Sequence, residues 1–120
     1  MVHSYFLTIL CLVLLFGSTA CESYNKKVVT NFDTAVKLIA DNESYQTKIV
    51  RLKLRLKSNT NHPIKIALIS GDQLVQEIFL QVGDTTTTLV DWYSNYAELT
   101  FTSNHSINGS IQIEYKFIGL

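Results

Sequence analysis

Eight consecutive residues, Val50 to Lys57, constrain the fold of this chain more than any other stretch. Apolar and cationic side chains alternate strictly along them, a period of two that is typical of a half-buried β-strand and incompatible with helical spacing. We predict a strand over residues 47–58. Its apolar side chains point into a core, and the opposite face carries Arg51, Lys53, Arg55 and Lys57.

Seven further segments have strand character and are separated by residues that favour turns, such as Gly71-Asp72 and Asn108-Gly109. We predict strands over residues 26–30, 33–41, 64–70, 73–82, 85–90, 97–102 and 111–117. Alternation within the later segments predicts inward side chains at Ile64, Ile66, Leu68, Ala97, Leu99, Phe101, Ile111, Ile113, Tyr115 and Phe117.

Two of these segments leave alternatives open. Residues 33–41 fit a strand through Val36, Leu38 and Ala40, but they also fit helical spacing. Ile78-Phe79-Leu80 interrupts the alternation of its segment, which indicates either burial on both faces or a bulge. With seven or eight short strands and a single proline, the pattern predicts an all-β fold, an antiparallel β-sandwich of the jelly-roll type.

The first twenty residues have the character of a signal peptide. Residues 6–16 form an apolar run of about the length of a signal h-region, shorter than the roughly 20 residues that cross a bilayer. The small residues Ser18 and Ala20 follow, so we expect cleavage near Ala20 and a single β-sandwich domain over residues 21–120. Because Met1 to Tyr5 contain no lysine or arginine, a retained N-terminal anchor is the alternative.

Cys21 and three N-glycosylation motifs indicate two alternative secretory routes. Residues Ser18 to Cys21 resemble a bacterial lipobox with Ser18 in place of the usual leucine, which would make Cys21 a lipidation site. Otherwise Cys21 is a free or intermolecular thiol. The three motifs lie in segments that we predict to be loops, at Asn42, Asn104 and Asn108. They favour a eukaryotic secretory route.

The charge of the chain is balanced in total but uneven in placement. Ten basic and ten acidic residues give no net charge, which argues against a general nucleic-acid-binding protein. Half of the basic residues nevertheless lie between Lys48 and Lys57. The cationic side of the predicted strand could bind an anionic glycan or an acidic protein. Alternatively, it is ordinary sheet charge paired with glutamates of neighbouring strands, namely Glu77, Glu98 or Glu114.

An aromatic cluster gives a second candidate for ligand binding. Trp92, Tyr93 and Tyr96 lie in a predicted corner between strands, where exposed aromatic rings would suit contact with a sugar or a protein. The alternative is that Trp92, the sole tryptophan, closes one end of the core.

The sequence offers little support for catalysis. The histidines and acidic residues do not have metal-ligand spacing, and no nucleophile or phosphate-loop motif occurs. We expect no enzyme activity, no cofactor and no metal. An enzyme whose site residues are dispersed in the sequence is a minor alternative.

The C-terminal third resembles the end of CUB domains. In residues Asn95 to Asn104, a hydrophobic strand with a phenylalanine leads into a turn, as in that family, and Gly109 to Tyr115 resembles the segment that follows. Upstream, Ile66 to Asp72 resembles the central strand and turn of the family. It implies a CUB-like jelly roll and extracellular recognition. The paired cysteines of the family are absent and its calcium ligands are not matched, so no site residue is transferred from it.

Together these features predict a secreted, N-glycosylated recognition module that binds an extracellular protein or an anionic glycan. It would bind no nucleic acid and have no membrane span after signal cleavage. The alternative function is that of a bacterial surface lipoprotein, anchored at Cys21, with a structural or adhesive role.

The two routes differ in the mass of the natively expressed protein. We expect a mature chain that begins near Cys21 and carries glycan on one or more of Asn42, Asn104 and Asn108. Intact mass spectrometry before and after enzymatic deglycosylation would measure this. A diacylglycerol adduct on Cys21, without glycan, would establish the lipoprotein route instead.

Overall fold

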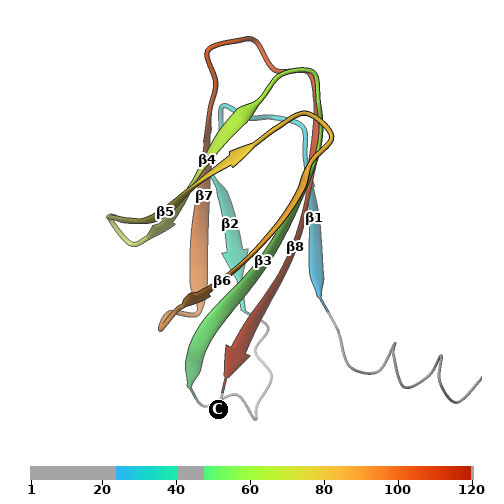
Figure 1. Cartoon of the computed structure of the whole chain (residues 1–120). Helices are drawn as coiled ribbons and strands as arrows, with labels where there is room; N and C mark the ends of the chain where they lie inside the picture. Colours follow the sequence, from blue (N-terminus) through green and yellow to red (C-terminus); the bar gives the residue numbers. More distant parts are fainter. Residues whose placement is uncertain (1–23, 41–47, 120) are drawn as a thin grey trace, which may run out of the picture.

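A computed structural model of the chain describes residues 24–40 and 48–119. They form a β-sandwich of two four-stranded antiparallel sheets (Figure 1), which confirms the predicted fold class. The strands are β1 (Asn25–Val29), β2 (Val36–Ile39), β3 (Ile49–Thr60), β4 (Ile64–Ser70), β5 (Gln73–Leu80), β6 (Thr85–Asp91), β7 (Tyr96–Thr102) and β8 (Gly109–Gly119). The predicted signal segment, Cys21 and Asn42 lie outside the described residues.

The strand order is that of a jelly roll. One sheet, here called sheet A, has the order β1-β8-β3-β6, and the other, sheet B, has the order β2-β7-β4-β5. In each sheet, strands far apart in the sequence become neighbours, as in the Greek-key connections of jelly rolls. Figure 1 shows the two sheets facing each other, with the β1–β2, β3–β4 and β7–β8 connections gathered at one end.

The segment with strict alternation becomes β3, which lies inside sheet A between β8 and β6. Leu52, Leu54 and Leu56 are completely buried, as predicted. The strand runs two residues beyond its predicted end, so Ser58 and Thr60 also point inward and are buried. Their hydroxyl oxygens lie 2.7 Å apart, and Thr60 Oγ1 donates to the backbone oxygen of His62 at 2.9 Å. This chain of hydrogen bonds satisfies both buried hydroxyls.

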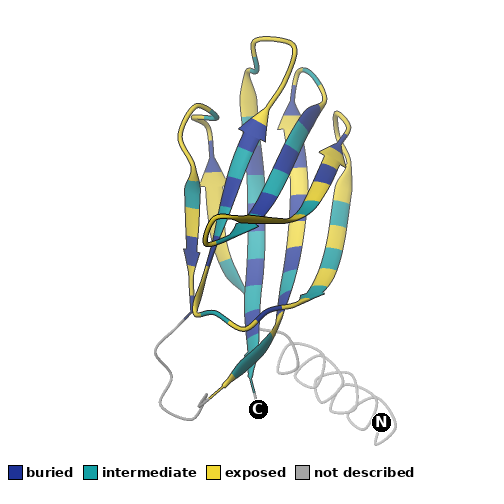
Figure 2. Ribbon diagram, turned by 90° about the vertical axis from the view of Figure 1, so that its left-hand side faces the viewer, coloured by how far each residue is buried: buried dark blue, intermediate teal, exposed yellow. Residues whose placement is uncertain are grey.

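The core consists of the inner faces of both sheets, and Figure 2 shows buried and exposed residues alternating along the strands. The side chains predicted to point inward from β4, β7 and β8 are all buried. The 33–41 segment contains a strand, with Leu38 and Ala40 buried. Of the two alternatives for Ile78-Phe79-Leu80, burial on both faces is wrong, because Ile78 and Leu80 are buried and Phe79 is exposed. The irregular register of β5 lies earlier, where Gln76 and Leu74 pair with Leu68 and Ile69.

The turn before β8 depends on a glycine. Gly109 has a φ of 111°, and a Cβ atom at this position would collide with the backbone oxygen of Asn59. Gly71, in the β4–β5 turn, also has a positive φ of 61°, but nothing lies near the place of its Cβ.

We therefore expect Gly109→Ala to lower the free energy of unfolding by about 2 to 4 kcal/mol, because it combines backbone strain with a steric clash. Gly71→Ala is the control, with an expected loss of about 1 kcal/mol from the backbone conformation alone. Urea denaturation of both variants would measure the difference. Equal losses would show that Asn59 does not confine Gly109.

The two sides of β3 should respond differently to charge. Leu54→Asp places a carboxylate in the completely buried core and should cost about 5 kcal/mol or more, comparable to the whole stability of many domains. Lys53→Glu should change stability by less than about 1 kcal/mol, because the side chain lies on the outer face opposite Lys116. The yield of folded secreted protein and its urea midpoint measure both. Equal damage from the two substitutions would contradict the assignment of the faces.

Candidate binding face

The outer face of sheet A gathers basic side chains from three adjacent strands. Residues directly opposite one another in antiparallel strands project to the same face, so the register places the outward residues of β1, β8 and β3 together. The cationic face, as we call it, consists of Lys26, Arg51, Lys53, Arg55, Lys57 and Lys116. Among the described residues, the acidic side chains that share this face are those of Glu114 and Asp91.

Glu114 lies in the middle of the cationic face and is already engaged. One carboxylate oxygen is 4.0 Å from Lys26 Nζ and accepts a hydrogen bond of 3.2 Å from Gln112 Nε2. The other is 3.8 Å from Arg55 Nη1. Its side chain is 18% exposed, whereas those of Lys26 and Arg55 are 66% and 52% exposed. The two cations therefore keep most of their surface open to a ligand while Glu114 fixes their position.

Two lysines stand directly opposite each other on this face. Lys53 of β3 pairs with Lys116 of β8, and like charges in such cross-strand positions destabilise a sheet. The Lys53 ammonium also lies 5.6 Å from the ring centroid of Tyr24, within the range of a cation–π contact. The register thus places two ammonium groups side by side within the cationic face.

The glutamates proposed as partners of the cationic side chains occupy different sheets. Glu114 pairs with Arg55 and Lys26, as described above. Glu77 belongs to β5 and pairs with Lys65 at 3.8 Å, and Glu98 belongs to β7, opposite Lys37. Both therefore lie in sheet B, away from the cationic face. One of the three predicted partners neutralises part of the face, and the other two do not.

The aromatic cluster does not form one surface. Trp92 is 2% exposed, its indole N–H donates to the backbone oxygen of Tyr96 at 3.0 Å, and its own backbone N–H donates to Val50 at 3.0 Å. The prediction that Trp92 contacts a ligand is thus corrected: the side chain closes one end of the core. Tyr93 is exposed in the β6–β7 connection, and Tyr96 is on β7 in sheet B. Neither belongs to the outer face of sheet A.

The loop from Ser103 to Asn108 contains the whole Asn104 motif and the first residue of the Asn108 motif, whose Gly109 and Ser110 already belong to β8. Asn104 and Asn108 are both exposed there. His105, next to Asn104, stacks on His62 of the β3–β4 connection, with ring centroids 4.3 Å apart. In the described parts of the chain, no group of three His, Cys, Asp or Glu side chains is placed to hold a metal ion. Nor do those parts include a helix long and apolar enough to cross a membrane.

Sequence reasoning missed two members of the cationic face, Lys26 and Lys116. The outward direction of Lys116 follows from the alternation of β8, whose inward residues were predicted correctly. What the sequence does not indicate is that β8 lies beside β3, and β1 beside β8.

No protein-family model matches the chain, and no curated protein matches its sequence. Among solved structures, it is similar to a chain of Bacillus endospore appendages, described as a novel family of disulfide-linked pili, with 19% identity and a TM-score of 0.46, over 81% of this chain and 88% of that chain. It is also similar to the coat protein of Tobacco streak virus, with 11% identity and a TM-score of 0.43, over 80% of this chain and 90% of that one. At these scores neither likeness bears on function.

Proposed function

We propose that this protein is a non-catalytic extracellular recognition module that binds an anionic polysaccharide on the outer face of sheet A. The observation that carries the proposal is that, among the described residues, one sheet face gathers six basic side chains and two carboxylates in a chain without net charge. Such an uneven distribution attracts polyanions through the local field.

The geometry favours an extended ligand over a compact one. Arg51, Lys53, Arg55 and Lys57 follow one strand, with alternate residues roughly 7 Å apart, so they span about 20 Å. This spacing is shorter than the Debye length of about 8 Å at physiological salt, so the fields of neighbouring side chains add. A shallow hollow between Arg55, Lys57, Gln112 and Glu114 has a volume of about 130 Å³, enough for a small anionic group on a longer chain.

The position of Lys53 beside Lys116 also supports a role in binding. The two lysines lie directly opposite each other on the outer face, and neither residue is part of the core. An anionic ligand bound there would lie near both ammonium groups. An acidic protein is the other partner that such a face could accept, but a row of evenly spaced charges on a strand matches a repeating polymer better.

Export of the chain is part of the proposal and rests on the apolar segment at residues 6–16 and on the exposed positions of Asn104 and Asn108. If Cys21 is lipidated instead, the same domain would be displayed on a bacterial surface, close to its anchor because β1 begins at Asn25. The cationic face would be available to a ligand in either setting.

Heparin affinity tests the proposal. The wild-type protein should bind immobilised heparin near 0.15 M salt and elute as the salt concentration increases. Arg51→Gln combined with Lys57→Gln should weaken binding about thirtyfold, if each cation contributes about 1 kcal/mol near an anionic surface. Neither residue has a carboxylate within 4.0 Å among the described residues, so the double variant should fold normally.

A matched control removes the same amount of charge elsewhere. Lys37→Gln combined with Lys65→Gln changes two lysines of sheet B and should leave heparin affinity within about twofold of wild type. Equal losses in the two variants would mean that heparin senses net charge alone. Unchanged binding of the first variant would exclude the cationic face as the site.

A further inference from the structure

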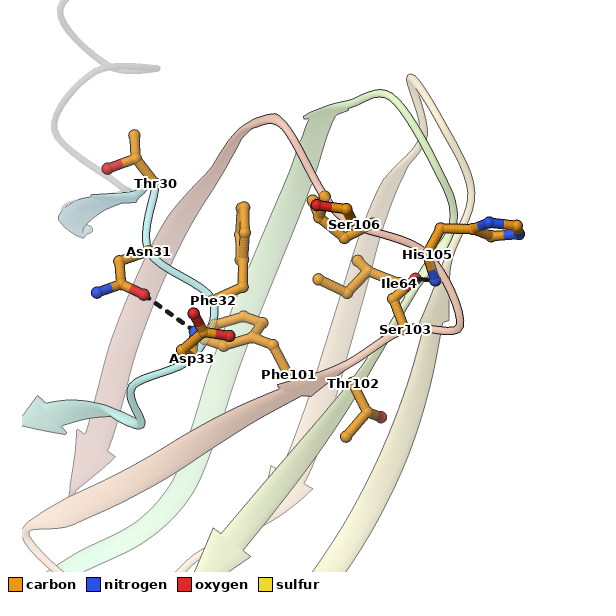
Figure 3. Close-up of a pocket in the computed structure, with 11 residues that line it drawn as sticks. Thr30, Asn31, Phe32, Asp33, Ile64, Phe101, Thr102, Ser103, His105 and Ser106 are labelled. Atoms are coloured by element: carbon orange, nitrogen blue, oxygen red, sulfur yellow. Dashed lines mark hydrogen bonds between the residues drawn. The ribbon is translucent and has the colours of Figure 1, made fainter.

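A second concave site lies at the end of the sandwich where β1 connects to β2 and β7 connects to β8 (Figure 3). It has a volume of about 510 Å³, within the range of roughly 300 to 1,000 Å³ that is usual for small-molecule sites. It belongs to neither the cationic face nor the aromatic cluster. We infer that this pocket binds one or two units of a neutral sugar, independently of the function proposed for sheet A.

The floor of the pocket is the apolar end of the core. Phe101 of β7 and Ile64 of β4 are buried, and Phe32 and Ile107 pack partly buried against them. The rings of Phe32 and Phe101 meet edge to face, with centroids 5.5 Å apart. Figure 3 shows Phe32 standing beside the cavity with Phe101 beneath it. An apolar, aromatic floor can pack against the C–H groups of a sugar ring.

The rim supplies uncharged hydrogen-bonding groups. Thr30, Asn31, Thr102, Ser103 and Ser106 contribute hydroxyl and amide groups. Among the described residues that line the pocket, Asp33 supplies the one carboxylate, and there is no lysine or arginine. This mixture of donors and acceptors matches the hydroxyl groups of a sugar. An anionic ligand, by contrast, would meet Asp33 without a compensating cation.

Hydrogen bonds within the protein hold the rim of the pocket in place without a ligand. Asn31 Oδ1 accepts a hydrogen bond of 3.0 Å from the backbone N–H of Asp33. Ser103 Oγ donates to Pro63 at 3.1 Å and accepts from the N–H of His105 at 3.2 Å.

Two further contacts hold the loop from its other side. Asn61 Oδ1 accepts a hydrogen bond of 2.8 Å from the backbone N–H of Asn108. The ring of His105 points away from the pocket in Figure 3 and stacks on His62. A preformed rim lowers the ordering cost of binding, which matters for sugars because each hydrogen bond contributes little.

Asp33 and Ser106 are the side chains that best test the inference. Both are exposed at the rim, and neither side chain forms a hydrogen bond with another described residue. Removing them should therefore affect a ligand more than the fold. Asp72 and Ser70, in and beside the β4–β5 turn at the other end of β4, form a matched pair of one acid and one hydroxyl.

The experiment is an amide NMR titration of the full mature chain, produced in bacteria so that Asn104, whose glycosylation motif includes Ser106, carries no glycan in any variant. The ligands are methyl glycosides of glucose, galactose, mannose and N-acetylglucosamine. We expect at least one glycoside to bind saturably in the millimolar range, with shifts concentrated in residues 30–33 and 101–107. Asp33→Ala combined with Ser106→Ala should weaken that binding at least tenfold, whereas Asp72→Ala combined with Ser70→Ala should leave it within twofold. The amide spectra themselves report whether each variant is folded.

Three outcomes would overturn the inference: no saturable shift with any glycoside at 50 mM, shifts located elsewhere on the sandwich, or binding that the Asp33 and Ser106 variant retains in full. Heparin oligosaccharides added to the same sample separate the two sites. They should shift resonances of sheet A and leave the pocket unchanged. If heparin shifts the pocket and the neutral glycosides do not, the pocket is an anion site and the inference fails.

Discussion

Burial of the apolar side of β3 is the interaction on which the rest of the structure depends. Leu52, Leu54 and Leu56 are completely removed from water, and each contributes about 1.5 to 3 kcal/mol on burial. Their sum is comparable to the net stability of a typical domain, about 5 to 15 kcal/mol. Because β3 pairs with β8 on one side and β6 on the other, a shift of its register by one residue would turn its cationic side chains into the core.

The same constraint creates the cationic face. Once the leucines point inward, the period of two obliges Arg51, Lys53, Arg55 and Lys57 to point outward together. The fold then adds Lys26 and Lys116 and brings one well-engaged carboxylate, Glu114, among them. The register of β3 therefore determines that its basic side chains point outward. How much positive charge gathers on this face depends on which residues the neighbouring strands carry.

This distinction explains how far the sequence could predict the structure. Alternation is a local property, so the strands and the inward residues of β3, β4, β7 and β8 were predictable. Strand order is not a local property, because sheet A forms by pairing of segments that are distant in the sequence, in the order β1-β8-β3-β6. No pattern of residues within one segment indicates which segment will pair with it. For this reason Glu77 and Glu98 could be proposed as partners of β3 although they lie in the other sheet. The pocket was missed for the same cause, because residues 30–33 and 101–107 are separated by most of the domain.

The two ends of the sandwich differ in how the connections cover the core. A sandwich of two sheets leaves its core open at both ends, and the ends must be covered by the connections. At one end Trp92 covers it with a large apolar side chain whose N–H bonds to Tyr96. At the other end the connections are polar, and Phe32 and Ile107 cover the core only in part. A concave surface with an apolar floor and a polar rim follows from this difference, so the end without a tryptophan is where a small ligand can reach the edge of the core.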